Sequence, residues 1–275
     1  MKKLLYFIFI VQLLFATCTT KPPDEPPEPL DPELEAFVDE WGLRPYLYVC
    51  KSVKDAVKYP EPWNNDIEQT FVIPDETIRS MSTCGLLETM LNYSFLFPLL
   101  KTWGPSEAYI LSFNVTMFNN DLREYKAAVE FFNRDNFFPV LVSKYLPVIN
   151  ANDFVIFNET RDDYVFVNHI EMLLSSDMCM SLTNEREKNQ LMAMALERIK
   201  YTENNYSAYA TPCHIMIAIM KSSRYEPFMQ DIEPRLIEST YGYAMREPDG
   251  NYLDGHHYRD IIMEYANQFL NEQKL

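Results

Sequence analysis

The segment TPCHIMIAIMKSSR, from Thr211 to Arg224, carries the clearest helix signal in the chain. Its apolar residues recur every three or four positions, which is the spacing of one face of an α-helix. Thr211 offers a side-chain oxygen to the N–H groups of a first turn, and Pro212 has no N–H group to leave unbonded there. We therefore expect a helix that begins at Thr211 and Pro212, buries one apolar face and ends near Lys221.

Similar apolar stripes, several with polar or capping residues at their start, lie on both sides of this segment. They predict helices near residues 46–57, 83–91, 122–132, 140–149, 166–174, 183–199 and 258–269. Strand-like alternation is confined to short runs such as Asp153 to Phe157. Glycine, which tight β-turns need for positive φ, occurs only six times in 275 residues. The sequence thus predicts an all-α fold, as an α/α array or an irregular multi-helix bundle.

The N-terminus has the features of a bacterial lipoprotein signal peptide. A basic start, Met1-Lys2-Lys3, precedes a nearly unbroken apolar run of 13 residues from Leu4 to Ala16. A membrane-spanning helix needs about 20 such residues, so the shorter run fits a cleaved signal. The residues LFAT before Cys18 resemble a lipobox, although Phe15 and Thr17 depart from its usual pattern. We expect cleavage before Cys18 and lipid on its thiol, with ordinary signal cleavage as the alternative.

A proline-rich acidic stretch follows the expected lipidation site. Residues 19–33 read TTKPPDEPPEPLDPE, with six prolines between positions 22 and 32. Such a stretch favours polyproline II and forms a semi-rigid spacer. The predicted organisation is a signal peptide at 1–17, the lipidated cysteine and tether at 18–33, and one helical globular domain at 34–275. We expect an outer-membrane lipoprotein of the cell envelope, on its periplasmic or external face.

The acidity of the chain excludes some classes of binding partner. The formal net charge is −16, and loss of the two lysines in the signal takes it to −18. Such a chain repels phosphate backbones and anionic lipid, so we expect no nucleic-acid partner. Contact with the membrane is expected only through the lipid on Cys18.

Four cysteines remain besides Cys18, and their role stays open at this point. They are Cys50, Cys84, Cys179 and Cys213, scattered through apolar stretches without a C-x-x-C pair. In an exported protein they could form two disulfides in any of three connectivities. The simpler interpretation is that they are small buried core residues.

Three stretches together resemble a known group of proteins. They are IPDE (Ile73–Glu76), MSTCGLLET with LNY (Met81–Tyr93) and IEMLL (Ile170–Leu174). This pattern resembles uncharacterised Bacteroidetes lipoproteins with helical, repeat-like bodies, over roughly residues 70–225. Ser94 stands where those proteins often have proline. The resemblance implies an exported helical domain and assigns no catalytic residue, because the group has no assigned chemistry.

The densest polar cluster is DGHHYRD, from Asp254 to Asp260. Its carboxylates and the imidazoles of His256 and His257 are ligand types for a transition metal. Adjacent residues of a helix point about 100° apart, however, so both rings rarely reach one ion. The simpler interpretation is a helix start, with Asp254 as cap and the histidines as surface groups. We expect no metal and no cofactor, and keep Asp254, His256 and His257 as candidate catalytic residues.

Two other histidines lie within apolar stripes. His214 follows Cys213, but nucleophile and base normally come from separate segments, since adjacent helical residues diverge. His169 lies between Asn168 and Ile170 in a similar setting. Both are expected to be structural.

These observations favour a non-enzymatic binding or scaffold lipoprotein that uses a helical groove for a protein, peptide or glycan. No Gly-x-Ser-x-Gly, phosphate loop or zinc-type cysteine spacing occurs in the sequence. The alternative is a small hydrolase with a site near Asp254–Asp260.

Lipidation can be tested directly. The wild-type protein should partition with membranes and incorporate labelled palmitate, whereas Cys18→Ala should do neither, because the thiol is the acylated group. The measurement is radiolabel incorporation in the producing bacterium. Equal labelling of the two proteins would contradict the lipoprotein assignment.

Overall fold

The computed structural model describes residues 31–50, 53–57, 73–91, 115–150, 161–202, 206–239, 242–247, 249–251, 253 and 255–273. The chain divides into two compact units, Met1–Phe37 and Val38–Leu275. Helices dominate the described residues, which confirms the predicted all-α, multi-helix fold class. Cys18, the run from Asp153 to Phe157, and Asp254 lie outside the described residues.

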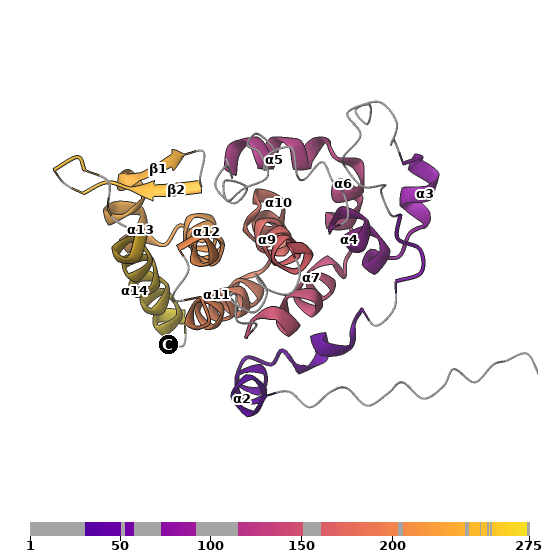
Figure 1. Cartoon of the computed structure of the whole chain (residues 1–275), viewed down its shortest axis with the longest axis horizontal. Helices are drawn as coiled ribbons and strands as arrows, with labels where there is room; N and C mark the ends of the chain where they lie inside the picture. The colour runs from indigo at the N-terminus through magenta and orange to yellow at the C-terminus, as the bar shows by residue number, and fades with distance from the viewer. Residues whose placement is uncertain are drawn as a thin grey trace, which may run out of the picture. The chain divides into compact units, whose positions relative to one another are not determined.

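Figure 1 shows the elements, which carry its labels throughout. The α-helices of the described residues are α2 (Pro32–Glu40), α3 (Asp75–Ser80), α4 (Thr83–Leu91), α5 (Val115–Glu124), α6 (Lys126–Phe132), α7 (Phe137–Tyr145), α9 (Arg161–Ser175), α10 (Asp177–Leu182), α11 (Glu185–Lys200), α12 (Tyr206–Ser222), α13 (Glu226–Asp231) and α14 (Gly255–Gln273). The 3-10 helices are η1 (Arg44–Tyr48), η4 (Leu146–Val148) and η5 (Glu233–Arg235). Strands β1 (Leu236–Ser239) and β2 (Gly242–Met245) form an antiparallel hairpin, which the sequence analysis did not predict.

The described part of the first unit contains the start of α2. The carboxylate of Asp31 accepts a hydrogen bond from the backbone N–H of Glu33 at 2.9 Å. Glu33 and Glu35 add negative charge to the first turn, where the helix dipole is positive.

Helix α12 is the central helix of the second unit. It packs most extensively on α9, α11 and α14, and lies between α9 and α14 in Figure 1. The predicted stripe is buried, at Ile215, Met216, Ile219 and Met220, and Ile217 on another side of the helix is buried as well. A helix that is apolar on all sides is one that other helices surround.

The predicted start of this helix is wrong. Helix α12 begins at Tyr206, and Pro212 lies inside it. Proline in a helix removes one N–H hydrogen bond. Alanines at 208 and 210 are strong helix formers, so the turn before Pro212 remains helical, and packing on three neighbours offsets the lost bond.

The stripe predicted over residues 122–132 is two helices rather than one. Tyr125 has extended backbone angles, φ −80° and ψ 106°, and separates α5 from α6. In the stretch 140–149, α7 begins earlier, at Phe137, and ends at Tyr145, and the short η4 that contains Pro147 follows it.

Three polar side chains meet in the core between α7, α9 and α11. The Tyr145 hydroxyl donates to Oε1 of Glu171 at 2.9 Å, and Nε of Arg198 lies 3.6 Å from the same oxygen. Arg198 also donates from Nη1 to the backbone oxygen of Ile149 at 3.4 Å. Arg198 and Glu171 are each 1% exposed, so this is a fully buried ion pair. Breaking such a pair by removing one partner strongly destabilises a protein.

The helix predicted over residues 46–57 is wrong, because tertiary bonds hold this segment against α4. After η1 the chain is non-helical at residues 53–57. A disulfide joins Cys50 to Cys84, and the N–H of Val57 donates to Oγ1 of Thr89 at 2.9 Å. These contacts override the local apolar periodicity.

Asp55, in this segment, binds Ser82, the residue that caps α4. Its carboxylate accepts from the backbone N–H and the hydroxyl of Ser82, and the Ser82 hydroxyl accepts from the N–H of Gly85 at 3.0 Å. The hydrogen bonds from Ser82 lower the pKa of Asp55. A Cβ atom at Gly85 would collide with the Asp55 carboxylate, so this position needs glycine for close approach.

The effect of Gly85→Ala should therefore change sign with Asp55. In the wild-type background the substitution displaces the cap and should destabilise by about 1 kcal/mol or more. In an Asp55→Ala background it should stabilise by up to about 1 kcal/mol, because alanine is the better helix former. Urea unfolding of the four proteins measures both effects. The same sign in both backgrounds would contradict the contact.

Candidate functional site

The structure places His256 and His257 in the first turn of α14, and both are exposed. Arg259 next to them pairs with Asp260 at 2.8 Å, and Tyr258 is buried. In the described part of the chain, no three His, Cys, Asp or Glu side chains are grouped so that they could hold a metal ion. The candidate catalytic residues His256 and His257 thus lie on the surface at the start of a helix. The third candidate, Asp254, lies outside the described residues.

His169 and His214 are core residues of α9 and α12, the two helices that pack on each other. Burial lowers the pKa of His214 from its ordinary 6.5 to about 4. Burial likewise lowers the pKa of His169 to about 4, against a smaller opposing effect of the hydrogen bond from the ring to the backbone of Leu91, which favours the protonated form. Both imidazoles are therefore neutral at pH 7.

Two of these four cysteines form a disulfide, and the other two are buried core residues, so each of the two interpretations holds for one pair. Cys50 and Cys84 form a disulfide that closes a 34-residue separation. Cys179 and Cys213 carry free, fully buried thiols, and burial raises the pKa of each. A protonated, buried thiol is an inert core group rather than a nucleophile.

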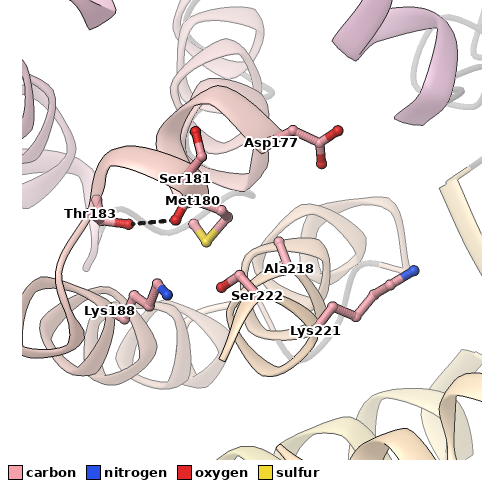
Figure 2. A pocket seen from close by; sticks show the side chains of 8 residues that line it. All are labelled: Asp177, Met180, Ser181, Thr183, Lys188, Ala218, Lys221 and Ser222. Carbon is pink, nitrogen blue, oxygen red and sulfur yellow. Dashed lines mark hydrogen bonds between the residues drawn. The ribbon is translucent and has the colours of Figure 1, made fainter. Parts of the chain in front are cut away.

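The candidate site is a pocket of about 510 Å³ formed by α10, the start of α11 and the end of α12 (Figure 2). Its volume falls in the range of small-molecule sites. The side chains that line it are Asp177, Met180, Ser181, Thr183, Lys188, Ala218, Lys221 and Ser222.

Asn184 fixes the start of α11 beside the pocket through a capping box. Its side chain accepts from the N–H of Glu187 at 3.0 Å, and the Glu187 carboxylate accepts from the N–H of Asn184 at 2.9 Å. The sequence predicted this start one residue earlier, at Thr183. The reciprocal bonds fix the first turn of α11, which Lys188 follows directly.

Lys188 is the buried charge of the pocket. Its side chain is only 8% exposed, and Nζ donates to Oε1 of Glu185 at 2.9 Å. In Figure 2 the Lys188 nitrogen, the Ser222 oxygen and the Met180 sulfur converge, whereas Asp177 and Lys221 point outward. The inner part of the pocket thus holds a buried ammonium group that is paired with one carboxylate.

The hydroxyl groups of the pocket donate to backbone oxygens. Thr183 donates to Cys179 at 3.0 Å and lies 3.4 Å from the oxygen of Met180, the contact drawn in Figure 2. Ser222 donates to the oxygen of Ile219 at 3.0 Å. A hydroxyl that has donated its proton keeps its lone pairs as acceptors. These two oxygens can therefore accept hydrogen bonds from a ligand.

The outer charges of the pocket are paired with neighbours. Asp177 lies 3.1 Å from Nη2 of Arg123, and Lys221 lies 3.3 Å from Oε1 of Glu233. Both pairs are substantially exposed, so water screens them.

Sequence reasoning missed this site, although one signal for it exists. Extending the apolar stripe of Leu191 and Met192 back by one turn leads to Lys188, a charge on the buried face of the helix. A lysine there predicts a buried cation with a specific partner. The partners on α10 and α12 could not be read from the sequence.

Comparisons with known proteins give no relative: no family model, no curated protein and no solved structure matches the chain. The resemblance to Bacteroidetes lipoproteins therefore stays a prediction.

The buried histidines make stability depend on pH. The pKa of both imidazoles is lower in the folded than in the unfolded chain. The unfolded chain therefore binds more protons between pH 6.5 and 4. The free energy of unfolding thus falls as the pH falls through this window. Between pH 7 and pH 5, each buried histidine should lower the free energy of unfolding of the protein by about 2 kcal/mol. Urea unfolding at both pH values measures the loss, and His214→Asn should remove about half of it.

The exposed His256 provides the control, since His256→Ala should leave the loss unchanged. Carboxyl groups with lowered pKa, such as Asp55, act mainly below this window. A pH-independent unfolding free energy between pH 7 and 5 would contradict the burial of two neutral imidazoles.

Proposed function

We propose that this protein is a non-enzymatic binding lipoprotein of the bacterial cell envelope, anchored by lipid on Cys18. The observation that carries the proposal is the pocket between α10, α11 and α12, which combines a buried ammonium with hydroxyl acceptors. Such groups orient a ligand by hydrogen bonds. The ligand is a small molecule or the end of a peptide or glycan chain.

Two features support an exported location. The basic start, short apolar run and Cys18 form a lipoprotein signal, and the proline-rich residues 19–33 suit a tether between lipid and domain. The disulfide between Cys50 and Cys84 adds to this, because such bonds persist mainly in oxidising compartments. An outer-membrane lipoprotein of the Bacteroidetes type fits both features. None of the helices in the described ranges is long and apolar enough to span a bilayer.

The second candidate function is a small hydrolase with its site near Asp254–Asp260. It would use His256 or His257 as a general base, and these side chains are exposed at the start of α14. The pocket favours the first candidate, because it brings the Lys188 ammonium of α11 together with the hydroxyls of Ser222 on α12 and Thr183 between α10 and α11.

One experiment distinguishes the two candidate functions. The purified full-length protein, in detergent, is incubated with chromogenic esters, glycosides and peptides, and in parallel titrated with a small-molecule panel while the NMR signal of the Met180 methyl group is followed. We expect shifts of the Met180 signal without turnover, because the pocket has binding groups. Turnover that His256→Ala and His257→Ala abolish would contradict the proposal.

A further inference from the structure

We infer that the pocket binds the α-carboxylate end of a short zwitterionic peptide, with the Lys188 ammonium as the group that holds the carboxylate. This inference rests on the binding function proposed above and names the chemistry of its ligand.

Lys188 has more hydrogen-bond donors than its ion pair with Glu185 uses. An ammonium group has three N–H donors, and burial of such a charge is costly unless it is paired and hydrogen-bonded. Within the described residues, Glu185 Oε1 is the acceptor that the structure gives it, at 2.9 Å. Two donors remain on a side chain that is 8% exposed and lines the pocket. A carboxylate has two oxygens that can accept from them.

Two hydroxyl acceptors line the same pocket as this cation. The Thr183 and Ser222 hydroxyls have donated to backbone oxygens, at 3.0 Å each, and can accept from a ligand. In the last residue of a peptide, an N–H donor lies one carbon away from the carboxylate. The last residue of a peptide can thus accept from the Lys188 ammonium with its carboxylate and donate to a hydroxyl oxygen with its N–H group.

The net charge of the protein favours a zwitterionic ligand over an anionic one. The chain has a net charge of −16, which repels anions at a distance. This long-range repulsion is screened beyond about 8 Å at physiological salt, and it nearly vanishes for a zwitterion, which has no net charge. A zwitterionic peptide can therefore bring its carboxylate to Lys188 with little repulsion.

The size and apolar lining of the pocket agree with this ligand. Met180 and Ala218 provide apolar surface for a side chain of the bound residue. The pocket volume of about 510 Å³ leaves room for more than one residue. We therefore favour a peptide end over a free amino acid, and the test separates these two sources.

The test uses alanylalanine, its C-terminal amide and free alanine as probes. Each is titrated into the full-length protein in detergent while the methyl signal of Met180, assigned by Met180→Leu, is followed by NMR. Alanylalanine should bind at least about tenfold more tightly than its amide, because the amide lacks the charge that Lys188 holds. It should also bind more tightly than alanine. Tighter binding of alanine would overturn the peptide assignment.

Variants assign the binding to the lysine. Lys188→Met keeps the apolar stem and should weaken alanylalanine binding by about tenfold. Lys200→Met is the matched control, because Lys200 pairs with Glu197 at the same i,i+3 spacing on the same helix but is 64% exposed. It should leave binding unchanged. Ser222→Ala, which removes an acceptor without removing a charge, should weaken binding a few-fold.

Equal binding of dipeptide and amide, or of wild type and Lys188→Met, would overturn the inference. If the dipeptide has no effect but a sugar or another panel compound shifts the Met180 signal, the inference fails and the binding function stands. If no compound shifts it, both fail.

Discussion

Glu171 and Arg198 place opposite charges in the centre of the helical body, where each is 1% exposed. Their attraction must offset the loss of hydration of two ions, which it does only when the geometry is good and further hydrogen bonds are made. Here Tyr145 and the backbone oxygen of Ile149 make those bonds. The pair thus ties α7, α9 and α11 to one arrangement, since any other leaves a charge buried without its partner.

The pocket depends on this arrangement. Helix α11 carries Arg198 near its end and Lys188 in its second turn, so the ion pair that orients the helix also orients the pocket cation. Helix α12 packs on both α9 and α11 and brings Ser222 to the same place. Short α10 adds Met180 and leads through Thr183 into the capping box of α11. The groups that line the pocket therefore lie on, or directly beside, helices that pack into the core.

Local sequence patterns predicted most helices, because each apolar stripe occurs at the period of its helix. They gave no prediction for the short helices α2, α3, α10 and α13. Within the predicted segments they failed mainly where distant residues decide the backbone. Residues 53–57 are bonded to α4 through Asp55 and Val57, and a break at Tyr125 divides a continuous stripe. Pro212 lies inside a helix whose neighbours offset its cost. The pocket was missed for the same reason, since Lys188 and Ser222 are far apart in sequence and meet only through packing.

The most direct test of this account is a double-mutant cycle on the buried pair. The unfolding free energies of wild type, Arg198→Met, Glu171→Gln and the double variant are measured in urea at pH 7. Each single substitution should cost about 3–5 kcal/mol, because it leaves the other charge buried, and the double variant should cost far less than their sum. A coupling energy above about 2 kcal/mol would support the account, whereas additivity within about 0.5 kcal/mol would contradict it.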